Sequence, residues 1–128
     1  MNSTRFLILG AINAFLAVVL GAFGAHALKA TLSPDMLAVY HTAVQYHSWH
    51  ALGLIATGLI AERLPHSRAI AAAGWAMCAG IVLFCGSLYL LAVTGERWLG
   101  AVTPFGGFAF LAAWALVAFA VSRARAKT

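Results

Sequence analysis

Acidic residues are scarce in this chain of 128 residues, which has only three Asp and Glu, and charged residues of any kind make up 9% of it. Soluble domains carry a charge on about a quarter of their residues. The three acids, Asp35, Glu62 and Glu96, lie outside the long apolar stretches. The scarcity of charge excludes an ordinary soluble domain. The lack of a carboxylate within the apolar stretches also argues against a conventional proton-coupled transporter.

Signatures of catalysis and of metal binding are also lacking. The chain has no His-Glu-x-x-His, no Cys-x-x-Cys and no Gly-x-Ser-x-Gly, and no carboxylate lies near Ser87 to orient a histidine. The two cysteines, Cys78 and Cys85, would stand roughly 10 Å apart on a helix, which is too far for a disulfide. We interpret them as small apolar packing residues, and we do not expect an enzyme.

The chain has instead four long stretches free of Asp, Glu, Lys and Arg, at 6–28, 36–61, 69–95 and 98–122. Each is longer than the roughly 20 residues that a helix needs to cross about 30 Å of hydrocarbon. The sequence therefore predicts an all-α integral membrane protein, a four-helix transmembrane bundle that forms one domain over residues 1–128. We place the helices approximately at 6–28, 36–61, 69–94 and 104–122.

Basic residues are distributed unevenly between the two ends of these helices. If the N-terminus is cytoplasmic, the opposite side carries only Lys29 and Arg97. The cytoplasmic group is then Arg5, Arg63, Arg68, Arg123, Arg125 and Lys127. Loops rich in Lys and Arg face the cytoplasm, so we expect both termini there. The pI near 9.9 then reflects topology and not nucleic-acid binding, and the basic tail makes at most a weak contact with anionic lipid.

The first helix carries a stripe of small residues on one face. Its members, which recur every three or four residues, are Gly10, Ala14, Ala17, Gly21 and Ala25, with Gly24 beside them. Small residues let helix backbones approach closely in lipid, where no hydrophobic driving force brings helices together. We expect this stripe to pack the first helix against the second.

The second stretch is unusual because its first half is polar. Its strictly apolar part, 51–61, would rise only about 16 Å as a helix, which is about half a membrane. To cross, the helix must include 41–50, and His50 then lies near the bilayer midplane. Ser33 and Pro34 are typical of a helix start. The sequence leaves open whether 34–41 belongs to this helix or lies at the membrane interface.

The third and fourth stretches are typical of a helical hairpin. Gly95 and the charged pair after it indicate the end of one helix. Thr103 and Pro104 are typical of the cap and the first position of the next helix. We therefore expect 95–103 to connect the two helices.

Polar side chains in the outer half of the predicted bundle form the candidate site. His47 and His50 occupy adjacent positions on one helix face, and Tyr46 neighbours His50 in the same way. If the first two helices are antiparallel, His26 lies at the level of His41, above His47. The candidate residues are His26, Gln45, Tyr46, His47, His50 and Tyr89.

Side chains at this depth must face other helices or a water-filled cavity, because lipid offers them no hydrogen bonds. Hydrogen-bonded packing is the interpretation we favour. The alternatives are a metal site with His26, His47 and His50 as weak ligand candidates, a haem site, and a site for another ligand or a proton path. We predict no cofactor.

Four sequence blocks, taken in order, resemble one protein family. They are Gly21-Ala22-Phe23-Gly24-Ala25-His26, Thr42-Ala43-Val44-Gln45-Tyr46-His47 with His50-Ala51-Leu52, Gly86-Ser87-Leu88-Tyr89-Leu90-Leu91, and Thr103-Pro104-Phe105-Gly106-Gly107. Nearly the whole chain is similar to the domain-of-unknown-function family 423, small bacterial inner-membrane proteins also called uncharacterised protein family 0382, with eukaryotic transmembrane protein 256 as a relative. The resemblance implies a multi-pass protein of the bacterial plasma membrane, and it supplies no catalytic or ligand-binding residues.

Two functions stay open at this point. The first, which we favour because the chain is small and has no ionisable carboxylate in its apolar stretches, is a structural or accessory protein. Its partners would be the lipid bilayer and other membrane proteins, including further copies of itself. The second is the binding or transport of a small molecule, a proton or a metal ion at the polar site around His26, His47 and His50, motivated by the cost of polar groups within a membrane.

Overall fold

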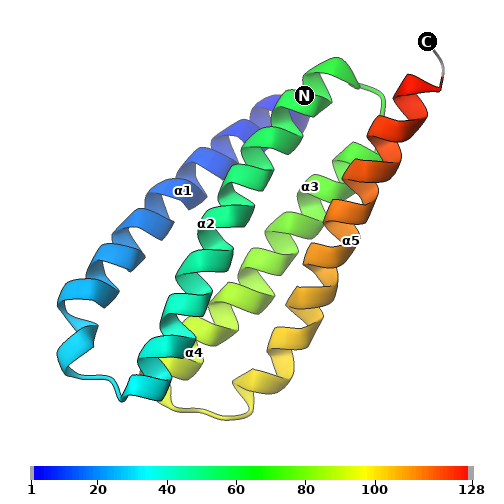
Figure 1. Cartoon of the computed structure of the whole chain (residues 1–128). Helices are drawn as coiled ribbons and strands as arrows, with labels where there is room; N and C mark the ends of the chain where they lie inside the picture. The colour runs from blue at the N-terminus through cyan, green and yellow to red at the C-terminus, as the bar shows by residue number, and fades with distance from the viewer. Residues whose placement is uncertain (1, 127–128) are drawn as a thin grey trace.

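The computed structural model describes residues 2–126, which form helices joined by short turns (Figure 1). The elements in chain order are α1 (Asn2–His26), η1 (Leu28–Ala30), α2 (Pro34–Arg63), α3 (Arg68–Gly80), η2 (Ile81–Cys85), α4 (Gly86–Thr94) and α5 (Leu99–Arg125). The π-helical η2 joins α3 and α4 without a break, so these three elements form one rod and the described residues make four rods. Lys127, one of the bases counted above, lies outside the described residues.

Both ends of the chain lie at one end of the bundle (Figure 1). We call this the terminal end, and it also holds the turn between α2 and α3. The far end holds the α1–α2 and α4–α5 connections. Compared with the predicted 6–28, α1 is shifted toward the N-terminus, because the helix already includes the residues from Asn2 onward and ends at His26.

α2 is one continuous helix of 30 residues. Ser33 caps it, since its side-chain oxygen accepts a hydrogen bond of 3.2 Å from the N–H of Met36, and Pro34 occupies the first turn. The predicted start of the second helix is confirmed. Residues 34–41 therefore belong to α2 and do not form a separate interfacial helix.

The start of α5 corrects the prediction. Gly95 ends α4 as expected, with a φ of 73° in the left-handed region, but α5 begins at Leu99 and not near Pro104. The N–H of Leu99 bonds the carbonyl of Glu96 at 3.2 Å, so the helix starts as soon as the chain has turned. Pro104 lies inside α5. The helical bond that it removes is the one to the carbonyl of Gly100, an exposed residue of the first turn.

α1 packs along α2 over most of its length. A Cβ atom on Gly10 would come within 2.9 Å of the Ala51 carbonyl oxygen, and Gly24 leaves room for the ring of Tyr40. Ala25, by contrast, is exposed, so this member of the predicted stripe does not face α2 and Gly24 takes its place. The remaining members, which are buried or half-buried, are Ala14, Ala17 and Gly21.

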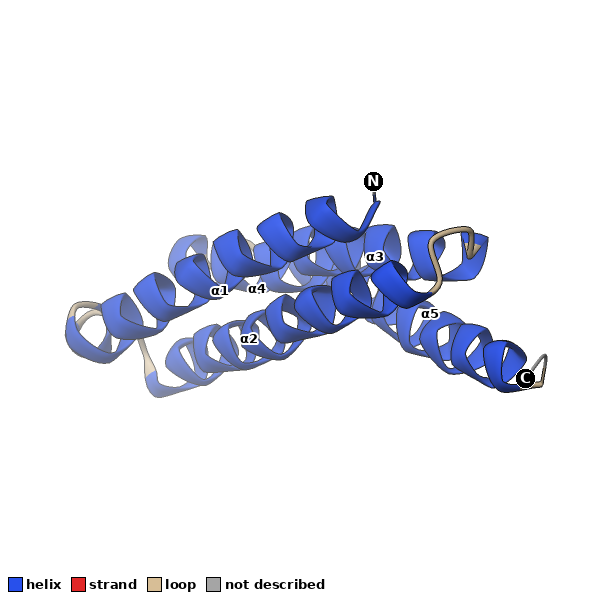
Figure 2. Ribbon diagram, turned by 90° about the horizontal axis from the view of Figure 1, so that it is seen from above, coloured by secondary structure: helices blue, strands red, loops and turns tan. Residues whose placement is uncertain are grey.

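α2 and α5 each pack on the rod formed by α3, η2 and α4. The central core between the rods consists of Phe6, Leu54, Met77, Cys85 and Phe110, together with smaller neighbours. α2 and α5 themselves make almost no backbone contact, and Figure 2 shows α5 diverging from α2 toward its C-terminal end.

Within residues 2–126, three rods are long and apolar enough to cross a membrane, namely α1, the α3–η2–α4 rod and α5. α2 is long enough but less apolar, because its buried face carries polar side chains such as His47, His50 and Thr57. Large apolar side chains such as Phe15 on α1 and Phe108 on α5 are exposed on the outer surface, as expected where lipid covers a protein. The predicted all-α membrane bundle is confirmed.

Candidate functional site

His47 lies in a chain of hydrogen bonds that links three rods. The side chain is only 4% exposed. Its Nε2 atom is 3.0 Å from Oδ1 of Asn13 on α1, and its Nδ1 atom is 3.0 Å from the hydroxyl of Tyr89 on α4. The amide nitrogen of Asn13 donates to the carbonyl of Leu9 at 2.8 Å.

This network assigns a proton to one nitrogen of His47. Because the Asn13 amide nitrogen is used at Leu9, its oxygen faces His47 and accepts from Nε2–H. The Nδ1 atom therefore accepts the hydroxyl proton of Tyr89. Both ring nitrogens of a neutral imidazole are thus satisfied, and the chain ends on a helix carbonyl.

His50 is also 4% exposed, but it points toward α5. The indole N–H of Trp114 donates to its Nε2 atom at 3.1 Å, and its Nδ1 atom is 2.7 Å from the carbonyl oxygen of Tyr46. Because indole can only donate, Nε2 is the acceptor and Nδ1 carries the proton. The imidazole lies nearly parallel to the Phe110 ring, with 3.4 Å between ring centroids. His50 therefore ties α2 to α5 where the two helices otherwise make little contact.

The structure does not bring the six candidate residues into one site. His47 and His50 are engaged with different rods, and Tyr46 packs its ring on Phe84 with 4.5 Å between centroids. Gln45 is exposed. Two pairs of candidates are hydrogen-bonded: the hydroxyl of Tyr89 bonds the ring of His47, and the ring of His50 bonds the backbone carbonyl of Tyr46.

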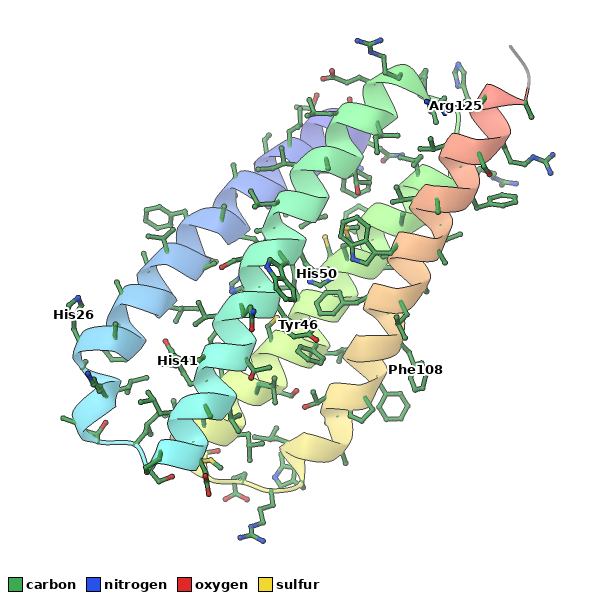
Figure 3. The ribbon with its side chains drawn as sticks, in the orientation of Figure 1. His26, His41, Tyr46, His50, Phe108 and Arg125 are labelled. Carbon is green, nitrogen blue, oxygen red and sulfur yellow. The ribbon has the colours of Figure 1, made fainter. Side chains whose placement is uncertain are left out.

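The side chain of His26 does not face α2, the helix that carries His47 (Figure 3). His26 is exposed near the end of α1 and points away from α2 (Figure 3). The reason is helical geometry, because Gly24 faces Tyr40 on α2 and a residue two positions later projects about 200° around the helix. His41, at a similar level on α2, is exposed as well (Figure 3).

Among the described residues, no three His, Cys, Asp or Glu side chains are grouped so that they could hold a metal ion. Ligation by His47 or His50 would also require one of the hydrogen bonds above to break. Every buried side-chain nitrogen and oxygen in this part of the chain has a partner. His47 and His50 bond side chains of neighbouring rods, and the hydroxyls of Ser48 and Thr57 bond carbonyls of α2 itself. The buried polar groups of α2 thus have protein partners, as a helix within a membrane requires.

Sequence reasoning missed the two residues that complete these networks, Asn13 and Trp114. Asn13 carried a usable signal, since an amide within a long apolar helix needs a hydrogen-bond partner. Trp114 carried none, because an indole in an apolar helix is equally typical of packing against lipid or protein.

A hollow opens on the side of the bundle between α2 and α5. It has a volume of about 390 Å³, with Phe84 of η2 beneath it. Its walls are mostly aromatic, and the lining residues are Tyr46, Trp49, His50, Phe84, Gly107, Phe110, Leu111 and Trp114. Figure 3 shows the side chains of Tyr46 and His50 directed from α2 toward α5. A hollow of this composition can receive an apolar chain or ring.

Residues 20–107 match a family described as "Protein of unknown function (DUF423)". The chain belongs to the DUF423 family. Among its relatives, the UPF0382 membrane protein YwdK of Bacillus subtilis is 54% identical over 90% of this chain and 94% of the relative. The UPF0382 membrane protein SERP0230 of Staphylococcus epidermidis is 46% identical over 90% of this chain and 93% of that protein. No solved structure matches the chain.

The resemblance seen in the sequence blocks is thus confirmed, and this DUF423 protein is a membrane protein in contact with a lipid bilayer. The matched region of the DUF423 family includes His47, His50 and Tyr89. Asn13 and Trp114, the partners that those histidines bond, lie outside residues 20–107.

Proposed function

We propose that this DUF423 protein is an accessory protein of the bacterial plasma membrane that binds a lipid or another membrane partner in the opening between α2 and α5. The observation that carries this proposal is the aromatic hollow of about 390 Å³ on the side of the bundle. It is the place where two neighbouring rods fail to cover each other. Because the hollow faces laterally, its occupant arrives from within the membrane.

In this proposal all four rods cross the bilayer and both termini are cytoplasmic. The terminal end carries Arg5, Arg63, Arg68, Arg123 and Arg125, whereas the far end carries only Lys29 and Arg97 as basic residues. That asymmetry supports a cytoplasmic terminal end. α2 crosses despite its polar residues, because the other rods supply their hydrogen bonds.

Transport through the polar residues has less support. A proton path needs groups that can accept a proton and pass it on, but the chain from Tyr89 through His47 and Asn13 stops at the carbonyl of Leu9. The exposed position of His26 also leaves it apart from this chain. The arrangement is what helix packing requires, and it favours a binding or structural function without catalysis.

Photo-crosslinking tests the proposal with two positions of matched exposure. Leu111, which is 69% exposed, lines the hollow, and Phe15, which is 68% exposed, lies on α1 away from it. Each is replaced in turn by a photoreactive phenylalanine, and the protein is purified in detergent, washed to remove bulk lipid and irradiated. We expect a discrete lipid or protein adduct at position 111 and none at position 15. Equal yields at both positions, or no adduct at either, would overturn the proposal.

A further inference from the structure

Nearer the terminal end, α2 and α5 border two further hollows that adjoin each other. The first, of about 760 Å³, has apolar walls that include Leu59, Ile60 and Val121. The second, of about 360 Å³, lies beside the α2–α3 turn and has His66, Ser67 and Arg123 in its lining. The two hollows share Arg63, Leu64 and Ala124. An apolar space is therefore joined to a polar one at the edge of the bundle.

The charged side chains that line these two hollows are all basic. They are Arg63, Arg123 and Arg125. The nearby acid, Glu62, lines a separate depression of about 140 Å³ with Asn2 and Ser3 on the α1 side. Arg123 lies over the ring of Phe119, with its Cζ atom 5.6 Å from the ring centroid. The planar guanidinium group matches the geometry of phosphate oxygens, so this end of the opening is complementary to a phosphate.

The stretch of α5 between the arginines and Trp114 has about the length of one leaflet. α5 rises about 16 Å between Trp114 and Arg125, and half of a hydrocarbon core of about 30 Å is about 15 Å. With the arginines at the headgroup level, the hydrogen bond between Trp114 and His50 lies near the bilayer midplane. A lipid chain that starts between the arginines and extends along α5 would therefore reach this hydrogen bond at the midplane.

We infer that the opening holds an anionic phospholipid of the cytoplasmic leaflet, an inference that rests on the proposed function. Its phosphate lies between Arg63 and Arg123, and one acyl chain runs along Leu59 and Val121 toward Trp114. The joined polar and apolar hollows favour this occupant over a second copy of the chain, since a transmembrane helix offers an apolar surface but no phosphate.

The test uses the full chain, purified in detergent and stripped of lipid. Phosphatidylglycerol and phosphatidylcholine with identical acyl chains are titrated separately, and occupancy of the first bound lipid is measured by native mass spectrometry. We expect phosphatidylglycerol to bind at least about tenfold more tightly, because it alone brings a net negative charge to the arginines. The double variant Arg63→Gln, Arg123→Gln should lose this preference, because its affinity for phosphatidylglycerol should fall more than its affinity for phosphatidylcholine. Arg97→Gln, at the far end, should behave as the unaltered protein.

A second variant separates this inference from the proposed function. Leu59→Trp fills the apolar hollow and should weaken the binding of both lipids. If Leu59→Trp does so while the unaltered protein binds the two lipids equally, the headgroup inference is overturned and lipid binding in the opening stands. If neither variant changes the binding of either lipid, or a dimer replaces the lipid adduct, the inference is overturned and the opening does not hold lipid.

Discussion

Replacement of Asn13 by Leu should lower the free energy of unfolding by about 1–2 kcal/mol. The two side chains are of similar size, so packing between α1 and α2 is retained, but the acceptor that lies 3.0 Å from Nε2 of His47 is lost. A buried donor without an acceptor costs about 1–3 kcal/mol. Hydrogen bonds between membrane helices have measured values that average about 0.6 and reach about 1.7 kcal/mol. The expected loss lies where these two ranges overlap.

Removal of all three hydrogen-bonded residues together should cost less than the sum of the three single removals. In the triple variant Asn13→Leu, His47→Leu, Tyr89→Phe, no buried donor or acceptor is left without its partner, and apolar groups of similar shape occupy the space. The triple variant should therefore be more stable than the sum of the three single losses predicts, with a coupling of about 1 kcal/mol or more.

Reversible unfolding in mixed detergent and sodium dodecyl sulfate micelles, followed by circular dichroism, measures these free energies. An unchanged free energy of unfolding for Asn13→Leu would refute the reasoning. Additive losses in the triple variant would refute it as well, because they would show that the three residues do not act as one hydrogen-bonded unit.

Two further predictions concern packing and topology. Gly24→Val should lower the free energy of unfolding by about 1–3 kcal/mol, because the ring of Tyr40 occupies the space of the new side chain. Ala25→Val, at an exposed neighbour, should lower it little. Equal losses for the two variants in the same unfolding assay would contradict the packing described. Thr31→Cys at the far end should react in intact cells with a thiol reagent that cannot cross the membrane, and His66→Cys at the terminal end should react only after the cells are opened; the reverse pattern would invert the proposed orientation.

The helices could be predicted from the sequence because their causes are local. Long stretches without charge, the Ser33 cap with Pro34, and Gly95 at a helix end each act within a few residues. The start of α5 could not be placed in the same way. Thr103 and Pro104 are compatible with a helix start and also with the second turn of a helix, and the turn at Glu96 decided between them.

The candidate site was predictable only as a set of polar residues in α2. His47 and His50 are close in sequence, yet they bond Asn13 and Trp114, which come from opposite ends of the chain. Their directions differ by about 60° around the helix. Which partner each histidine bonds depends on which rod lies on its side of α2, and only the tertiary structure places those rods.

The amino-acid sequence alone determined that the protein is helical, belongs in a membrane and carries most of its basic residues at one end. These properties follow from composition and from the periodicity of single helices, which need no knowledge of neighbours. Only the tertiary structure decided that α1 covers one side of α2 while α5 leaves the other side open. Helix association in lipid depends on close contacts such as Gly24 with Tyr40 and on hydrogen bonds between distant segments, because no hydrophobic force pairs the helices in advance.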